Sequence, residues 1–189
     1  MLGHEDGKFL LKIAREAIEN YLKNKKVIDT PENITLLFRE KMGVFVTIHK
    51  NGNLRGCIGY PEPIKPLINA VIDSAISAAT EDPRFPPMNP DELDHIDLEL
   101  SVLTPPQRVL VKNPVEYLEK IRVGIDGLII EKNYRKGLLL PQVPVEWGWD
   151  VEEFLVYTCL KAGLQPDCWY NEDVKVYKFQ AQIFQESAD

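Results

Sequence analysis

Two hydrophobic periodicities alternate along the chain, and together they predict a mixture of helices and strands. Apolar residues at three- and four-residue spacing are typical of amphipathic helices, and this pattern covers residues 8–24, 64–80 and 151–162. Strands are predicted over residues 43–50, 53–59, 95–103 and 174–184. Because hairpin turns join several strands, we expect an α+β fold with a mainly antiparallel sheet flanked by helices.

The strands over residues 43–50 and 53–59 are predicted to form a hairpin. Asn51-Gly52 between them is typical of a type I′ turn, in which both central residues need a positive φ. With a two-residue turn, Cys57 lies opposite Val46 and shares a sheet face with Arg55. His49 then points to the other face and cannot act as a base for Cys57. A bulge would reverse this parity, so the alternative arrangement remains open.

Polar residues at the predicted helix ends indicate where the helices begin and end. Asp6 is the expected N-cap of the first helix. Asp150 and Glu153 have the spacing of a capping box ahead of the helix over residues 151–162. Gly163 is suited to the C-terminal end of that helix.

Prolines at positions 61, 63, 66, 105 and 106 bracket one predicted helix and one predicted strand. The chain has 189 residues, enough for one large domain or two small lobes. We interpret the bracketed stretch as an insertion. The prediction is a single domain over residues 1–189, with a main lobe of about residues 1–60 and 107–189 and an inserted smaller lobe of about residues 61–106.

The charge composition of the chain narrows the classes of molecule that it could bind. The chain carries 29 acidic and 22 basic residues, a net charge of −7, and no dense run of Lys or Arg. This balance makes nucleic-acid binding an unfavourable interpretation, because such binding depends on neutralising phosphates. No apolar run approaches the ~18–20 residues of a membrane-spanning helix, and the first six residues lack a signal-peptide pattern. We therefore expect a cytoplasmic protein with no membrane association.

The cysteines and histidines do not form a recognisable metal or disulfide pattern. The cysteines are Cys57, Cys159 and Cys168, an odd number with no C-x-x-C spacing. We expect all three to be reduced thiols, with Cys159 and Cys168 packed in the core. The three histidines, at positions 4, 49 and 95, are too scattered to predict a metal site.

The most unusual stretch is Leu-Arg-Gly-Cys-Ile-Gly at residues 54–59. Glycine is unfavourable inside a strand, so Gly56 and Gly59 suggest that something approaches the backbone closely here. Cys57 between them is a candidate nucleophile or redox thiol, activated by Arg55 and nearby amides. The alternative is a small strand cysteine that only packs in the core.

A second candidate segment is Asp-Pro-Arg-Phe-Pro-Pro at residues 82–87. Its prolines restrict the backbone and present Arg84 and Phe85 on a rigid loop. Arg55 and Arg84 could bind an anion between them, because guanidinium groups match carboxylate and phosphate geometry. The alternative for both is a surface salt bridge. Similarly, Trp147 and Trp149 could line a pocket or simply pack.

Several segments together resemble one known family. They are residues 54–59, 82–87, 100–105, 124–128, 139–143 and 162–164. In this order, and over nearly the whole chain, they resemble the AMMECR domain family. The resemblance implies an α+β fold in two unequal lobes with a cleft. It also implies that Arg55, Gly56, Cys57 and Gly59 belong to the family's proposed functional site. Prokaryotic relatives are associated with Memo-type and radical-SAM proteins.

Two hypotheses follow for function. The first is an enzyme or enzyme component that binds a small anionic ligand in the cleft, with Cys57 as the reactive group. Its expected ligand contacts are Arg55, Gly56, Gly59, Arg84 and Phe85. The second is a non-catalytic adaptor for a Memo-type or other protein partner. Neither the residues nor the resemblance indicates a reaction, a cofactor or an oligomeric state.

Overall fold

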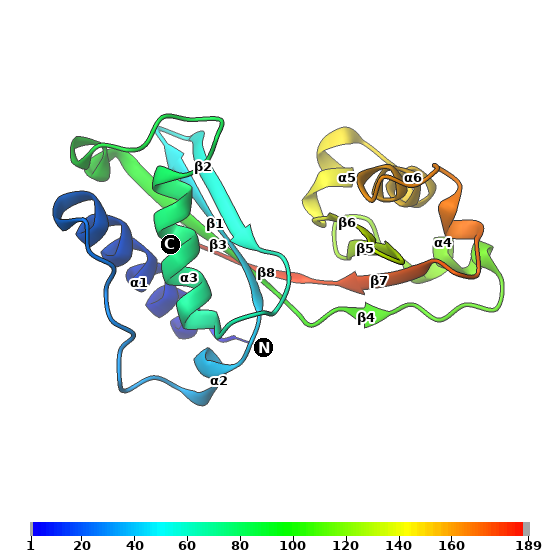
Figure 1. The fold of residues 1–189 in the computed structure, drawn as a ribbon, viewed down its shortest axis with the longest axis horizontal. Coiled ribbons are helices and arrows are strands. Elements are labelled where there is room, and N and C mark those ends of the chain that lie inside the picture. Colours follow the sequence, from blue (N-terminus) through cyan, green and yellow to red (C-terminus); the bar gives the residue numbers. More distant parts are fainter. Residues whose placement is uncertain (1, 187–189) are drawn as a thin grey trace. The chain divides into compact units, whose positions relative to one another are not determined.

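The computed structural model describes residues 2–186, which divide into two units. Unit 1 consists of Met1–Leu103 and Gln182–Asp189, and unit 2 consists of Thr104–Ala181. Each unit has its own four-stranded sheet, its own helices and its own hydrophobic core (Figure 1). The α+β class predicted from the sequence is therefore confirmed, with two sheets in place of one. The predicted cleft between lobes stays a prediction.

Unit 1 is a sheet covered by two long helices. Its strands are ordered β2-β1-β3-β8. The elements are α1 (His4–Asn24), α2 (Leu36–Arg39), β1 (Gly43–Lys50), β2 (Asn53–Tyr60), α3 (Leu67–Thr80), a 3₁₀ helix at Pro90–His95, β3 (Ile96–Leu103) and β8 (Ala181–Gln185). Helix α3 packs against β1, β2 and α1, and α1 also packs against β3 (Figure 1).

The buried face of β1 explains why this sheet needs its helices. Val44, Val46 and Ile48 are fully buried, and the alternating residues Thr47 and His49 are only half-buried. This is the alternation that the sequence predicted. Because β1 lies between β2 and β3, strand β2 forms an edge of the sheet. An edge strand has backbone groups without a strand partner, and these need hydrogen bonds from elsewhere.

The hairpin turn is confirmed, but the predicted register is wrong beyond it. Asn51 and Gly52 have φ values of 51° and 77°, as a type I′ turn requires. A bulge between Ile48 and His49 in the pairing then shifts the register, so that Cys57 lies opposite Thr47 rather than Val46. The extra residue is Arg55. Since a shift of one residue reverses the sheet face, Cys57 lies on the face of Thr47 and His49, away from the core.

Unit 2 is built on a second antiparallel sheet with strand order β4-β7-β5-β6. Its elements are β4 (Gln107–Arg108), a 3₁₀ helix at Pro114–Glu116, α4 (Tyr117–Lys120), β5 (Gly127–Lys132), β6 (Arg135–Leu139), α5 (Gln142–Trp147), α6 (Val151–Lys161), a 3₁₀ helix at Cys168–Tyr170 and β7 (Lys175–Phe179). Helix α6 packs on β5 and β6 and supplies Phe154 and Leu155, both fully buried.

The division between the units differs from the predicted lobes. Residues 61–106 were expected to form an insertion, but α3 and β3 within this range pack on β1 and belong to unit 1. The predicted strand over residues 174–184 is also two strands, β7 and β8, which belong to different sheets. Its alternation continues across Gln180 without a turn-forming residue, so the pattern gave no sign of the break. The prolines mark the ends of elements rather than the ends of units.

The predicted capping of α6 in unit 2 is confirmed, whereas the predicted N-cap of α1 in unit 1 is wrong. The Asp150 carboxylate accepts a hydrogen bond from the Glu153 N–H at 2.9 Å, and the Glu153 carboxylate accepts one from the Asp150 N–H at 3.0 Å. The predicted capping box is thus confirmed. Helix α1 begins one turn earlier than predicted, with Gly3 as its N-cap. Asp6 is therefore not the N-cap; its carboxylate accepts the Gly3 N–H at 2.8 Å.

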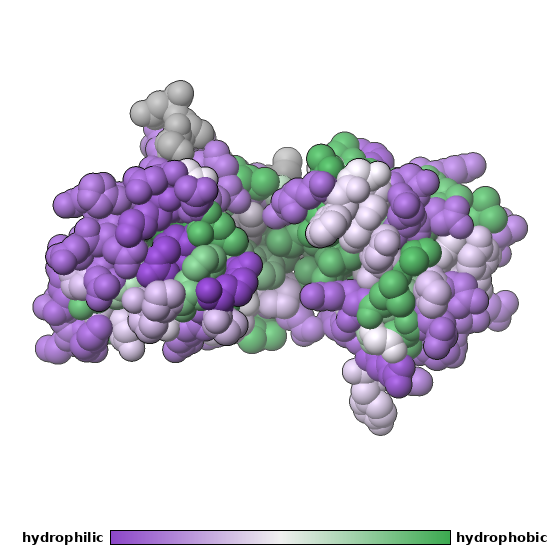
Figure 2. Space-filling view, turned by 90° about the horizontal axis from the view of Figure 1, so that it is seen from above, coloured by the Kyte–Doolittle hydropathy of each residue, from purple (hydrophilic) through white to green (hydrophobic). Residues whose placement is uncertain are grey.

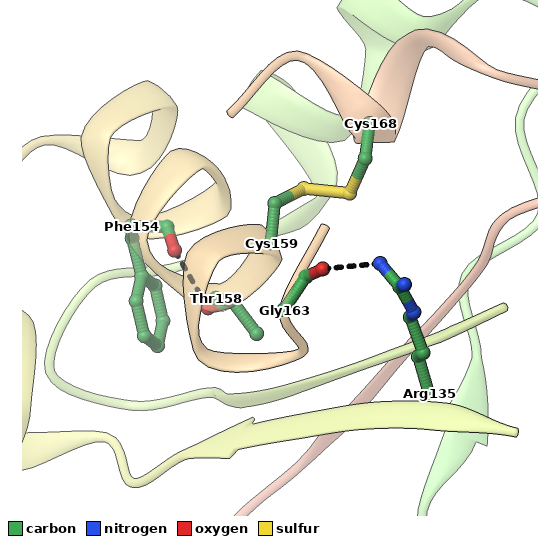
Figure 3. The surroundings of a disulfide bond; sticks show 6 residues. All are labelled: Arg135, Phe154, Thr158, Cys159, Gly163 and Cys168. Carbon is green, nitrogen blue, oxygen red and sulfur yellow. Dashed lines mark hydrogen bonds between the residues drawn. A yellow bond between two sulfur atoms is a disulfide. The ribbon is translucent and has the colours of Figure 1, made fainter. Parts of the chain in front are cut away.

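A disulfide bond corrects the expectation of three reduced cysteines. Cys159 at the end of α6 is bonded to Cys168, and both are buried (Figure 3). Gly163, with a φ of 70°, reverses the chain between them. The Arg135 side chain donates to the Gly163 carbonyl at 2.6 Å and fixes this reversal (Figure 3). Since spacing alone does not show a chain reversal, the sequence did not predict the pair.

Breaking this disulfide should destabilise unit 2. Loop-closure entropy for a closed loop of about 10 residues corresponds to about 2–3 kcal/mol. We expect the double variant Cys159→Ser/Cys168→Ser to unfold at a lower urea concentration than the wild type, as monitored by tryptophan fluorescence, since all three tryptophans lie in unit 2 and Trp169 is buried beside Cys168. Cys57→Ser is the matched control and should behave like the wild type. Equal midpoints for the double variant and the wild type would show that the bond adds no stability.

No helix among residues 2–186 has the length and hydrophobicity needed to cross a membrane.

Candidate functional site

The Cys57 thiol lies at the edge of the unit 1 sheet and is partly accessible. Cys57 is the free cysteine among the described residues. The Thr47 hydroxyl donates a hydrogen bond to the Cys57 sulfur at 3.3 Å. The Cys57 backbone N–H, on the edge strand β2, donates to the Asp82 carboxylate at 2.8 Å. The cysteine is thus fixed from both sides, and its side chain lies on the sheet face away from α3.

Asp82 connects the cysteine to Arg84. The Asp82 carboxylate is buried and accepts two hydrogen bonds from the Arg84 guanidinium, at 3.0 and 2.7 Å, and one from the Arg84 N–H at 3.1 Å. The Arg84 side chain is 53% exposed. The guanidinium, together with the Cys57 and Arg84 backbone amides, outweighs burial and holds the pKa of Asp82 well below its usual range. Asp82 is therefore an anion at neutral pH, and it fixes one edge of an accessible cation.

The pKa of Arg84 is raised in turn, first by its hydrogen bonds to Asp82 and, in smaller part, by attraction to Cys57. Asp82 is thus the shared partner of the Arg84 guanidinium and the Cys57 backbone N–H. Arg84, Asp82 and Cys57 form one connected group at the free edge of β2.

Arg55, the bulged residue, has a different environment. Its guanidinium donates two hydrogen bonds to the Glu92 carboxylate, both at 3.0 Å, and one to the Pro86 carbonyl at 3.0 Å. Its side chain is only 12% exposed. Lys50 also contacts Glu92 at 2.8 Å. Hydrogen bonds from Arg55, then from Lys50, lower the pKa of Glu92 to about 2. The Arg55 side chain thus connects the β1–β2 hairpin to the 3₁₀ helix at Pro90–His95, which follows the proline-rich loop.

Phe85 brings the two arginines together. The Arg84 and Arg55 guanidinium carbons lie 5.5 and 5.9 Å from the centre of its ring. Both distances are within the range of cation–π attraction. The three cations Lys50, Arg55 and Arg84 face two carboxylates here, so the cluster carries one net positive charge within a chain of net charge −7.

The glycines of the motif have a structural explanation. A Cβ added to Gly56 would lie 2.1 Å from the Ala78 carbonyl oxygen, on α3. A Cβ added to Gly59 would lie 2.2 Å from the Val44 carbonyl oxygen. The close approach that the sequence predicted is therefore present, and the group that approaches is the protein's own backbone. A role for either glycine in ligand binding stays a prediction.

Two carboxylates and one histidine extend the set of site residues. Asp82 belongs to the proline-rich loop over residues 82–87, but the sequence did not indicate it as a site residue. Glu92 was not indicated either, because its partners Lys50 and Arg55 are distant from it in sequence. The bulge also places His49 on the sheet face of Cys57, the arrangement that the uninterrupted register excluded. Among residues 2–186, no group of three or more His, Cys, Asp and Glu side chains is placed to hold a metal ion.

Comparison with known proteins identifies the family. The AMMECR1 family model matches residues 11–184, most of both units and the whole site. The chain belongs to the AMMECR1 family.

Similar proteins occur in archaea and extend over nearly the whole chain. A protein of Methanothermobacter thermautotrophicus is 60% identical over 185 residues, which cover 98% of this chain and 96% of that protein. A protein of Methanocaldococcus jannaschii is 57% identical over 188 residues, covering 98% and 92%. The crystal structure of an uncharacterized protein from Pyrococcus horikoshii superimposes with a TM-score of 0.88 at 55% identity, covering 98% of this chain and 94% of that one.

Proposed function

We propose that the chain binds a small anionic molecule at the β2 edge of unit 1, with Arg84 as the anion-binding group and Cys57 as the candidate reactive group. The observation that carries the proposal is the half-exposed Arg84 guanidinium, held by buried Asp82, which also accepts the backbone N–H of the free cysteine Cys57. A fixed guanidinium loses little side-chain entropy when it binds an anion.

The neighbouring residues have supporting roles. Phe85 orients Arg84 by stacking, and Arg55 fixes the loop that carries both through Glu92 and the Pro86 carbonyl. The Arg84 guanidinium is the accessible cation of this cluster and is the group that would attract an anion. A Memo-type partner remains a prediction from the family resemblance.

Alkylation of Cys57 by two reagents of different charge tests this function. Iodoacetate is anionic and iodoacetamide is neutral, and both react with the same free thiol. We expect the ratio of their rates, iodoacetate to iodoacetamide, to be about threefold or more higher in the wild type than in Arg84→Gln, because Arg84 concentrates the anionic reagent at the sulfur.

Arg39→Gln is the matched control, since Arg39 is an exposed arginine of unit 1 bonded to a backbone carbonyl. This variant should keep the wild-type ratio, and mass spectrometry should locate the label on Cys57. Equal ratios in the wild type and Arg84→Gln, or no reaction of Cys57 with either reagent, would overturn the proposal.

A further inference from the structure

A row of stacked aromatic rings lies on unit 2 and shares no residue with the site described above. Trp147 at the end of α5 stacks on Trp149 with ring centres 6.1 Å apart and an interplanar angle of 18°. Trp149 stacks on Tyr157 of α6 at 4.0 Å and 10°. Together with Val145 and Leu160 we call these residues the aromatic face. Because neighbouring rings in a stack cover one another's π surfaces, Trp147 at one end of the row is the most exposed of the three rings.

Packing against the core of unit 2 accounts for the position of Trp149, the middle ring, but not for those of Trp147 and Tyr157. Trp149 is half-buried against the core of the unit. Trp147 is 70% exposed and Tyr157 is 41% exposed, and the aliphatic residues Val145 and Leu160 are 58% and 48% exposed. From the side on which α5 and α6 lie, hydrophobic residues reach the surface of unit 2 beside charged ones (Figure 2). Val145 lies two residues before Trp147 on α5, and Leu160 lies one helical turn after Tyr157 on α6. Large apolar residues exposed near one another are typical of an interaction surface.

The charged residues around the aromatic face are mostly negative. Residues 138–161 contain four acidic residues and one basic residue, Lys161, which lies one helical turn after Tyr157 on α6. The acidic residues are Glu146, Asp150, Glu152 and Glu153, and all four are exposed. Glu153 lies one helical turn before Tyr157 on α6, so the two share a helix face. Asp150 and Glu153 cap the N-terminus of α6.

Exposed π surfaces among carboxylates favour one class of partner. A guanidinium or ammonium group over a tryptophan gains about 0.5–1 kcal/mol at an exposed site and about 2 kcal/mol when desolvated. Nearby carboxylates add to this attraction, whereas they repel phosphates and therefore nucleic acid. A second copy of the chain would bring the same negative face and a net charge of −7.

We propose that the aromatic face binds an arginine- or lysine-rich segment of a partner protein, with one cationic side chain stacked on Trp147. The carboxylates of Glu146 and Glu152 contribute to the charge that attracts the segment. Val145 and Leu160 contact its aliphatic parts. This surface and the proposed anion site prefer opposite charges, so one chain can bind an anionic small molecule and a cationic protein segment.

Calorimetric titration with a hexa-arginine peptide tests this inference on the full chain. We expect binding that weakens with added salt, a Kd about fivefold weaker for Trp147→Ala, and one about twofold weaker for Glu152→Gln. Because Trp147 is mostly exposed, the variant should fold, and circular dichroism checks this. The matched control is Tyr134→Ala, which removes a fully exposed tyrosine beside Lys132 and Arg135 and should bind as the wild type does.

Three results would overturn the inference. One is equal affinity of wild type and Trp147→Ala for the peptide, which would mean that net charge alone attracts it. Another is binding of a neutral maltooligosaccharide to the aromatic face without binding of the peptide. The third is a dimer in sedimentation that Trp147→Ala dissociates, which would make a second copy the occupant.

Discussion

Replacing Gly56 with alanine is expected to lower the free energy of unfolding of unit 1 by about 3 kcal/mol or more, at the upper end of the cost of overpacking. The new Cβ would lie 2.1 Å from the Ala78 carbonyl oxygen and 3.0 Å from its carbonyl carbon. Both atoms are backbone, so no side-chain rotation relieves the clash. Helix α3 packs against both α1 and the sheet and has no free direction in which to move.

Urea unfolding followed by circular dichroism measures this effect. Gly3→Ala is the control, because its Cβ would lie 3.5 Å from the nearest atom, an ordinary contact, and the change should cost less than about 1 kcal/mol. If Gly56→Ala keeps the wild-type stability and instead loses the preference of Cys57 for iodoacetate, then Gly56 contacts the ligand and the packing explanation is wrong.

Local patterns predicted the local structure well. The Asn51-Gly52 turn, the buried alternation of β1 and the capping box of α6 depend on residues close in sequence, and all three are present. The bulge was not predicted, because residues 54–59 fit either register. Arg55 is the extra residue, and ion pairs with Glu92 stabilise it there. The register therefore depends on a partner 37 positions away.

The candidate site likewise contains residues that the sequence indicated and residues that only the fold reveals. Cys57, Arg55, Arg84 and Phe85 were selected from the sequence because their residue types are unusual in those contexts, and the structure brings them together. The carboxylates of Asp82 and Glu92 were not selected. An acidic residue is common at any surface, and only the fold shows that Asp82 is buried and paired. The disulfide was missed for a related reason, since it depends on a chain reversal at Gly163.

Replacing Asp82 with alanine is expected to cost about 3 kcal/mol of unfolding free energy and to change its pH dependence. Its carboxylate accepts hydrogen bonds from the Cys57 N–H and from Arg84, and charge-assisted bonds of this kind contribute about 1.5–3 kcal/mol each. Because its pKa in the folded state lies below the ordinary value of 3.8, the unfolded state binds the proton more readily. The contribution of Asp82 is therefore fully present above pH ~4 and is lost as the pH falls further.

Unfolding free energies measured between pH 7 and pH 2 check this prediction. The wild type should lose stability more steeply below pH ~4 than Asp82→Ala, and Asp29→Ala, which removes an exposed carboxylate, should follow the wild type. A variant with an unchanged slope would show that Asp82 is not paired in solution.

A double-mutant cycle then separates the ion pair from the bond to Cys57. Arg84→Gln alone should cost about 1–2 kcal/mol, less than Asp82→Ala, because the buried Asp82 carboxylate loses a charged partner but keeps the Cys57 N–H. If Arg84 acts on stability only through Asp82, the double variant Asp82→Ala/Arg84→Gln should be no less stable than Asp82→Ala. The part of the Asp82→Ala destabilisation that exceeds that of Arg84→Gln is then attributed to loss of the hydrogen bond that the Cys57 N–H donates to Asp82. One buried carboxylate would in that case fix both the accessible cation and the strand that carries the thiol.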